Sequence, residues 1–198
     1  MAKFLLKILA AFGLFLLTPI IVFSLLLVLI EDGFPLFFIQ DRLGLNEKVF
    51  KIYKIRTMFN NTPNLGTHDI SNTNYLRTGH ILRKLKIDEL PQIINFIKGD
   101  INLIGPRPGL PNQYELTQCR NENNIFEIVP GISGLSQVLG YDMSNPKLLS
   151  KVDKLYINKK TVKLDLVIFI ATFYKPYKKK LNVMFENEIL KYSKEGKL

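Results

Sequence analysis

The chain has 198 residues, enough for one ordinary domain, and its 47% hydrophobic and 22% charged residues exclude a disordered or collagen-like protein. A single cysteine, Cys119, excludes an internal disulfide framework and a cysteine-based metal cluster. Lys and Arg number 27 against 17 Asp and Glu, a formal net charge of +10, which indicates an anionic partner such as nucleic acid, a phosphorylated substrate or acidic lipid.

The first predicted element is an apolar helix. Residues 8–30 form a run of 23 positions without a charge. As a helix this run would be about 34 Å long, close to the thickness of the bilayer hydrocarbon. The run is longer than the apolar core of a signal peptide, and no small-residue cleavage site follows it. It therefore predicts a membrane-resident segment, with a buried helix of a soluble protein as the alternative.

A proline near the middle of this run indicates how the segment lies in the membrane. Pro19, preceded by Thr18, lacks an amide proton and can kink a helix. Lys3 and Lys7 predict a cytoplasmic N-terminus, and the basic remainder of the chain favours the same side. A straight span cannot place both there. The sequence therefore predicts a re-entrant helix-break-helix over residues 1–32, broken at Thr18 and Pro19.

A β-hairpin is predicted next. Residues 34–41 and 49–58 are rich in aromatic and β-branched side chains and are separated by a turn. Basic and aromatic residues alternate over 51–56, which could bind nucleic acid but is more typical of one face of an amphipathic strand, so we expect no nucleic-acid partner. Residues 59–74 are polar and predict a loop, either a mobile lid or a plain surface loop. Residues 75–87 predict a basic amphipathic helix.

Turns and short elements follow. Pro91 suits the first turn of a helix and Gly99 suits its end. Residues 105–111 predict a proline-rich turn, and residues 130–140 predict a glycine-punctuated loop. The expected fold class is α+β and mostly helical.

The C-terminal part of the chain is strongly basic. Residues 151–198 contain 12 Lys and 5 acidic residues. The apolar run 164–174 is too short to span a bilayer, and lysines follow it at positions 175, 178, 179 and 180. This pattern predicts an interfacial helix held against anionic lipid, with a core helix followed by a solvated basic tail as an equal alternative.

Two local patterns could carry chemistry, and the first is Asp88-Glu89. The pair lies between apolar neighbours just before a predicted helix start, where anions are favoured. One carboxylate could attack a substrate or accept a proton while the other holds a hard cation such as Mg²⁺. The alternative is simple charge decoration of a helix N-terminus.

The second pattern is Arg107 between Pro106 and Pro108. The prolines stiffen the loop, and a fixed guanidinium suits bidentate binding of phosphate. The alternative is a solvated arginine in a turn. The two histidines, His68 and His80, are too few for a zinc site without further ligands.

Together these motifs resemble those of the monotopic phosphoglycosyl transferases of the bacterial sugar transferase superfamily, and the chain is close in size to the small members. Each motif is weak alone, but their order and spacing match through nearly the whole chain. They are Thr18-Pro19, residues 50–58, Leu82-Arg83, residues 88–92, residues 98–100, residues 105–108 and residues 130–137. Val129 and Tyr141 stand where many members have arginine, which leaves the identity of the sugar open.

The resemblance implies a reaction: transfer of a phosphosugar from a UDP-sugar to polyprenyl (undecaprenyl) phosphate with release of UMP, the first membrane step of glycoconjugate assembly. It implies that Asp88 is the nucleophile of a covalent aspartyl-phosphosugar intermediate and that Glu89 binds Mg²⁺. The positions matching phosphate-binding residues are Arg83, Arg107 and, as weaker candidates, Lys54 and Arg56.

The resemblance also implies a location at the cytoplasmic face of the bacterial inner membrane, with residues 1–32 entering one leaflet and residues 33–198 forming a catalytic domain on the cytosolic face. Anionic membrane lipid is an expected partner, and a homodimer is an open possibility. The alternative function is a membrane-anchored, non-catalytic protein that binds lipid or a partner. Intact Asp88, Glu89 and Arg107 favour the enzyme.

Overall fold

A computed structural model describes residues 2–60, 62 and 74–195 of the chain. The fold is α+β and mostly helical, as predicted. The chain divides into two compact units, which are described separately. The first unit comprises Met1–Asp41 and Lys51–Asp100, and the second comprises Arg42–Phe50 and Ile101–Leu198.

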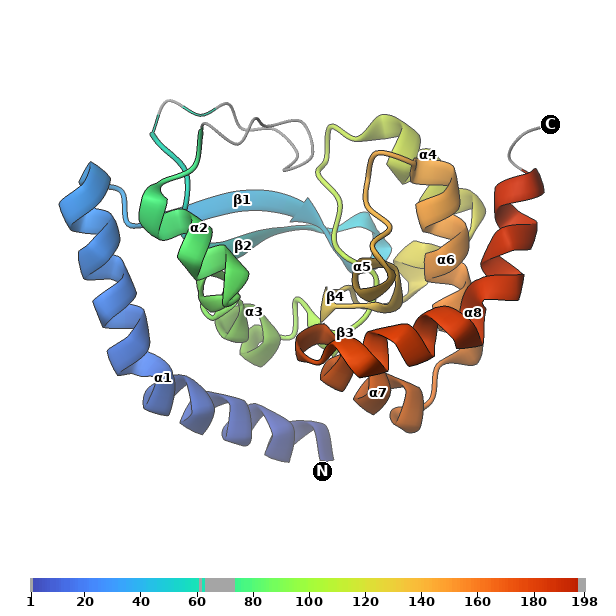
Figure 1. The fold of residues 1–198 in the computed structure, drawn as a ribbon, viewed down its shortest axis with the longest axis horizontal. Coiled ribbons are helices and arrows are strands. Elements are labelled where there is room, and N and C mark those ends of the chain that lie inside the picture. Colours follow the sequence, from blue (N-terminus) through green and yellow to red (C-terminus); the bar gives the residue numbers. More distant parts are fainter. Residues whose placement is uncertain (1, 61, 63–73, 196–198) are drawn as a thin grey trace. The chain divides into compact units, whose positions relative to one another are not determined.

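The N-terminal apolar run forms one helix, α1 (Ala2–Asp32), with Pro19 inside it. Figure 1 shows α1 as two stretches joined at a bend, and proline is the usual cause of a sharp bend. The predicted interruption at Thr18 and Pro19 is wrong in one respect, because the chain bends without leaving the helix. The Thr18 hydroxyl donates to the Leu14 carbonyl at 3.0 Å and the Ser24 hydroxyl to the Ile20 carbonyl at 2.8 Å. Such bonds also bend helices.

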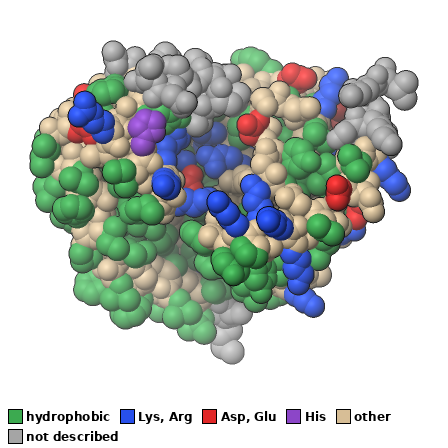
Figure 2. Space-filling model, viewed as in Figure 1, with side chains coloured by type: hydrophobic (Ala, Val, Ile, Leu, Met, Phe, Trp, Pro, Cys, Tyr) green, Lys and Arg blue, Asp and Glu red, His purple; other side chains and the backbone are tan. Residues whose placement is uncertain are grey.

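Most side chains of α1 are exposed although they are apolar. Phe4, Phe15 and Phe23 are each more than half exposed, and Figure 2 shows hydrophobic side chains gathered over this helix. Among the described helices, α1 is the one long and apolar enough to cross a membrane by length and composition. An exposed apolar helix is stable in lipid and unfavourable in water.

The predicted hairpin is confirmed. β1 (Phe37–Leu43) and β2 (Val49–Ile55) form a two-stranded sheet and are joined through a 3₁₀ turn, η1 (Leu45–Glu47).

Short helical elements follow in the first unit, among them α2 (Arg77–Lys84), the 3₁₀ turn η4 (Ile87–Glu89) and α3 (Gln92–Lys98). The helix predicted over 75–87 is therefore too long. It ends because Lys86 adopts a left-handed conformation with φ of 57°, which an α-helix cannot continue through. Pro91 precedes α3 and Gly99 ends it in a left-handed conformation, as predicted.

The core of the first unit joins α1 to the elements that follow it. Val28 of α1, Ile55 of β2, Leu76 and Leu82 are almost fully buried and form one cluster. The membrane-type helix therefore packs, near its C-terminal end, directly on the part of the chain that carries residues 77–89.

The second unit contains a parallel pair of short strands, β3 (Asn102–Ile104) and β4 (Gly131–Ser133), in which Asn102 pairs with Gly131. Its helical elements are α4 (Tyr114–Glu122), η5 (Ile125–Glu127), α5 (Leu135–Leu139), α6 (Pro146–Lys159), α7 (Val162–Phe173) and α8 (Lys175–Glu195).

The prediction of a loop over 130–140 is wrong, because this stretch forms β4 and α5. Its glycines serve close packing. A Cβ on Gly131 would lie 2.1 Å from the Gly105 nitrogen, and a Cβ on Gly134 would lie 2.2 Å from the Gly105 carbonyl oxygen. The glycines therefore let two backbone segments touch.

Helix α7, which covers most of the run 164–174, has one buried face and one exposed face, and its contact with anionic lipid stays a prediction. Leu164, Ile168 and Ala171 are buried in the core of the second unit. The opposite face is apolar and exposed, at Val162, Leu166, Phe169 and Phe173. The lysines that follow lie on α8, and this helix buries the apolar side chains of Leu181, Phe185 and Ile189.

A polar contact fixes the start of α7. The Tyr156 hydroxyl donates to Asp165 at 2.7 Å. Burial, together with this hydrogen bond, raises the pKa of Tyr156, so the phenol stays protonated and remains a donor.

Substitution of Gly131 tests the close approach of the two strands. We expect Gly131→Ala to lower the free energy of unfolding by about 3 kcal/mol, because the new methyl group would overlap backbone atoms that cannot move aside. Thermal unfolding in detergent measures the effect. Gly109→Ala is the matched control, since its Cβ would meet the flexible end of Leu116 at 3.1 Å. Equal melting temperatures for the two variants would contradict this packing.

Candidate active site

Asp88 and Glu89 lie in η4, the tight turn between α2 and α3. The Lys86 carbonyl accepts a hydrogen bond from the Glu89 amide at 3.3 Å, and the Ile87 carbonyl accepts one from the Leu90 amide at 3.1 Å. Asp88 is 4% exposed. Two adjacent carboxylates are therefore held at a fixed place on the protein, one of them buried.

Each carboxylate has a cation beside it. The Lys54 ammonium of β2 contacts the Glu89 carboxylate at 2.9 Å, and both side chains are largely buried. The Arg83 Nε of α2 lies 3.9 Å from the Asp88 carboxylate. The structure thus brings together four residues predicted from the sequence: Lys54, Arg83, Asp88 and Glu89. A buried carboxylate needs such compensation to stay ionised.

An aromatic ring fixes the guanidinium. Arg83 lies over the Tyr75 ring with its guanidinium carbon 4.7 Å from the ring centre, a cation–π contact that orients the guanidinium plane. The Tyr75 ring in turn contacts His80, with ring centres 5.2 Å apart.

Sequence reasoning missed Asn95, which is fully buried on α3. Its side-chain oxygen accepts from the Tyr53 amide at 3.2 Å, and its nitrogen donates to the Lys51 carbonyl at 2.7 Å and to Asp100 at 3.0 Å. Asn95 therefore ties β2, the strand of Lys54, to the helix that follows the carboxylates. A polar residue within the apolar stretch 93–97 is the signal that could have indicated it.

Arg56 has a different set of partners. Its side chain is 6% exposed and pairs with Asp32, at the end of α1, at 3.2 Å. The same guanidinium donates to the Gly33 carbonyl at 2.8 Å. Arg56 is therefore bound to the end of α1, and these contacts do not support its predicted role in binding phosphate.

Arg107 belongs to the second unit, on the segment between β3 and α4. Backbone contacts hold this segment on both sides. The Gly105 amide donates to the Ser133 carbonyl at 2.9 Å, and the Pro106 carbonyl accepts from the Gly131 amide at 2.9 Å. Further along, the Arg42 guanidinium donates to the Pro108 carbonyl at 3.1 Å. Arg107 is thus presented by a tightly held turn.

The carboxylates of Asp88 and Glu89 could hold Mg²⁺ only if a substrate phosphate and water supply its remaining ligands. No group of three His, Cys, Asp or Glu side chains that could hold a metal occurs among the described residues, and His68 lies outside them. Asp88 and Glu89 supply two hard oxygen donors, the number that Mg²⁺ commonly takes from a protein when phosphate and water complete its shell. The pair therefore suits an ion shared with a phosphorylated substrate. The predicted lid, residues 59–74, lies mostly outside the described residues.

The sequence model of the bacterial sugar transferase family matches residues 1–179, and the chain belongs to that family. The family expected from the motifs is thereby confirmed.

Curated relatives differ in length and in their stated substrates. The chain is 37% identical over 153 residues to the uncharacterized sugar transferase EpsL of Bacillus subtilis, a match that covers 77% of this chain and 75% of EpsL. It is 34% identical to the UDP-N-acetylgalactosamine-undecaprenyl-phosphate N-acetylgalactosaminephosphotransferase of Aeromonas hydrophila, over 78% of this chain and 38% of that protein. It is 30% identical to the UDP-glucose:undecaprenyl-phosphate glucose-1-phosphate transferase of Caulobacter vibrioides, over 78% of this chain and 61% of that protein.

Proposed function

We propose that the chain is a polyprenyl-phosphate phosphoglycosyl transferase, which moves a sugar phosphate from a UDP-sugar to undecaprenyl phosphate and releases UMP. The observation that carries the proposal is the adjacent carboxylates of Asp88 and Glu89, held in one turn with Lys54 and Arg83 beside them. Relatives named for transfer from UDP-sugars to undecaprenyl phosphate support the substrate classes.

Asp88 is the proposed nucleophile. Its carboxylate oxygen attacks the sugar-bearing β-phosphorus, forming an aspartyl-phosphosugar while the bond from that phosphorus to the UMP oxygen breaks. A phosphate oxygen of undecaprenyl phosphate then attacks the same phosphorus, and the Asp88 carboxylate leaves. Covalent catalysis of this kind replaces one difficult displacement with two easier ones. Burial of Asp88 supports the role, since a poorly hydrated carboxylate is a stronger nucleophile.

The cations make the approach of a diphosphate feasible. A carboxylate and a diphosphate repel one another unless positive charge lies close by. Arg83 lies on α2 beside Asp88, and its planar donor set suits phosphate oxygens. We assign Arg107 a phosphate-binding role on the same chemical ground. Lys54 holds Glu89 through its ion pair.

Glu89 is the residue that would hold Mg²⁺ together with the donor diphosphate. When bound, the ion would neutralise phosphate charge and stabilise the leaving UMP. Glu89 would then exchange its contact with Lys54 for the metal, leaving the Lys54 ammonium to bind an anionic substrate group.

Contacts of α1 support a re-entrant placement in the membrane. Near its start, the Lys7 ammonium lies 3.5 Å from the position that a Cβ of Gly99 would occupy, at the end of α3. At its other end, Glu31 accepts hydrogen bonds from α2. Both contacts lie within the first unit. A straight transmembrane helix would place its two ends on opposite sides of the bilayer, so this geometry favours a helix that enters and returns on one side.

Helix α7 and the lysines after it are the proposed contact with anionic lipid. The exposed face of α7 is apolar, and Lys175, Lys178 and Lys179 follow it on α8. Apolar side chains beside lysines match the chemistry of the bilayer interface. Because UDP-sugars are made in the cytoplasm, we place the protein at the cytoplasmic face of the bacterial inner membrane.

Substitution of the nucleophile tests the proposed function. We expect Asp88→Asn to lower turnover more than about 1000-fold in an assay with a panel of UDP-sugars and undecaprenyl phosphate, because an amide cannot form the acyl phosphate. Asp41→Asn is the matched control, since Asp41 is exposed and only loosely paired with Lys51. Near-normal UMP release by Asp88→Asn would overturn the covalent assignment, and an inactive wild type would favour a non-catalytic binding protein.

Removal of metal tests the role of Glu89. Activity should vanish in EDTA and return with Mg²⁺, and Glu89→Gln should raise the Mg²⁺ concentration needed for half-maximal activity, because one anionic ligand is lost. A magnesium titration of the wild type and the variant measures both effects. Full activity in the chelator would contradict the assignment.

Cysteine labelling tests the membrane topology. In a Cys119→Ser background, we expect Ala2→Cys and Glu47→Cys both to resist a membrane-impermeant thiol reagent applied from the periplasmic side. Replacing both Thr18 and Pro19 with alanine should straighten α1 and expose position 2. Labelling of Ala2→Cys with Thr18 and Pro19 intact would show that the unaltered helix already spans.

A further inference from the structure

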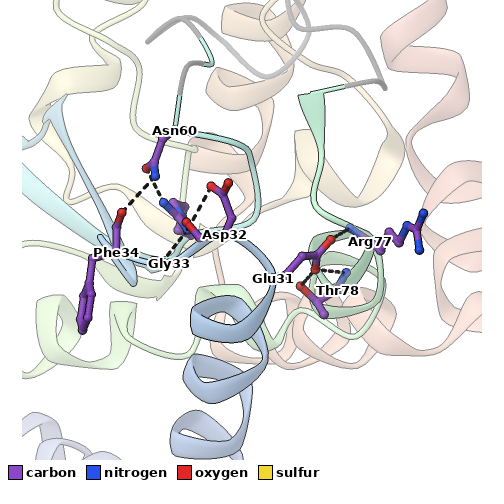
Figure 3. A network of polar contacts seen from close by, with 8 residues as sticks. Glu31, Asp32, Gly33, Phe34, Asn60, Arg77 and Thr78 are labelled. Carbon is purple, nitrogen blue, oxygen red and sulfur yellow. Dashed lines mark hydrogen bonds and ion pairs between the residues drawn. The ribbon is translucent and has the colours of Figure 1, made fainter.

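The two acidic residues of α1, Glu31 and Asp32, lie in its last turn. Acidic side chains at a helix C-terminus face the negative end of the helix dipole, which is unfavourable for an isolated helix. Their position therefore requires partners from elsewhere in the fold, and the structure supplies them (Figure 3).

Glu31 caps helix α2 from a distance of 46 residues along the chain. Its two carboxylate oxygens accept from the Arg77 amide at 2.6 Å and from the Thr78 amide at 3.0 Å. The Thr78 hydroxyl donates to the same carboxylate at 2.5 Å. The residue before α2, Leu76, has no side chain that could cap the helix. Glu31 thus satisfies the N-terminal amides that a local Ser, Thr or Asp would otherwise bind.

Arg56 caps the C-terminal end of α1. Its guanidinium donates to the Asp32 carbonyl at 3.1 Å and to the Gly33 carbonyl at 2.8 Å, and it pairs with the Asp32 carboxylate. It also donates to the Asn60 side-chain oxygen, and the Asn60 amide donates to the Phe34 carbonyl at 3.0 Å. The last carbonyls of a helix have no partner within it, so the buried Arg56 supplies one.

These contacts tie α1 to both elements that carry cations of the candidate active site. Thr78 and Arg83 lie on the same short helix, α2. Arg56 follows β2, where Lys54 lies two residues earlier. Any shift of the end of α1 would therefore be transmitted to Arg83 and Lys54, and through them to the carboxylates of η4.

We infer that Glu31 and Arg56 are positioning residues that clamp the membrane helix to the active-site elements and so fix the depth of Asp88 relative to the lipid surface. The inference rests on the proposed function. The depth of Asp88 relative to the lipid surface affects the access of the two substrates to it unequally. A UDP-sugar is soluble and reaches the site from water, whereas the acceptor phosphate is anchored at a fixed height by its lipid chain. The clamp therefore serves the second half-reaction, in which the acceptor attacks.

The test separates the half-reactions in Glu31→Gln, Thr78→Val and Arg56→Lys. Donor cleavage is measured as the burst of UMP released without acceptor. Acceptor transfer is measured with undecaprenyl phosphate in phosphatidylglycerol–phosphatidylethanolamine vesicles, and again with a short, water-soluble polyprenyl phosphate. Asp41→Asn is the control, an exposed carboxylate outside the clamp.

We expect the burst to change less than about threefold in each variant, while transfer to the vesicle-borne acceptor falls roughly tenfold or more, since an error of position near 1 Å can cost that much. The short acceptor, free to adjust its height, should restore transfer. Thr78→Val removes a single hydroxyl and is the mildest variant, so it keeps the test valid if the others fold poorly. An equal fall in both half-reactions, or no change in either, would overturn the inference.

Hydrogen exchange tests the clamp independently of activity. In Glu31→Gln the amides of Arg77 and Thr78 should exchange at least about tenfold faster than in the wild type, because one oxygen that accepts their hydrogen bonds is replaced by a donor. Amides of α6, in the second unit, should be unchanged. If the wild type cleaves no UDP-sugar, the proposed function fails, and unchanged exchange at Arg77 and Thr78 would show that the clamp fails as well.

Discussion

The burial of two neighbouring carboxylates, Asp88 and Glu89, in one turn constrains the first unit of this protein. Removing a carboxylate from water is costly unless cations or donors compensate for it. Lys54 and Arg83 do so for Glu89 and Asp88, and they come from different elements, β2 and α2. The strand and the helix must therefore both be fixed against the turn. Asn95 provides one of these attachments by bonding to the backbone of β2 from α3.

The same unit includes the apolar helix α1, and this connects the proposed active site to the proposed membrane segment. Val28 of α1 is packed with Ile55 and Leu82, so the C-terminal end of the apolar helix belongs to the core of the first unit. Polar contacts of Glu31 and Arg56 reinforce this junction. The proposed reaction joins a soluble donor to a lipid-borne acceptor, and the contacts of both ends of α1 with one folded unit support the proposal that its nucleophile lies at the membrane interface.

Local sequence patterns were sufficient where local physics decides the structure. Two runs rich in aromatic and β-branched residues predicted the hairpin, and Pro91 and Gly99 predicted the ends of α3. Local patterns gave the wrong structure where a contact with a residue distant in the sequence determines it. Gly131 and Gly134 are typical of a loop, but their role is to let the chain touch Gly105, which no local window shows. The helix over 75–87 ends early because of the left-handed Lys86, a conformation that lysine does not indicate.

The residues of the candidate site could be identified from the sequence, but the contacts that each one makes could not. Asp88 and Glu89 stand out as adjacent acids before a helix, and Arg83 lies beside them as expected. The family resemblance assigned both Lys54 and Arg56 to phosphate, as weaker candidates. In the structure Lys54 contacts Glu89, whereas Arg56 binds the end of α1, 24 residues earlier in the chain. That distinction depends on the way the strand meets α1, which spacing along the chain does not reveal.

Mass spectrometry of the protein after incubation with a UDP-sugar, without acceptor lipid, would detect the proposed covalent intermediate on Asp88. The account predicts a gain in mass equal to one sugar phosphate, located on the peptide that contains Asp88, together with release of UMP. The gain should disappear when undecaprenyl phosphate is added. UMP release that occurs only when both substrates are present, with no adduct on Asp88, would contradict the covalent mechanism.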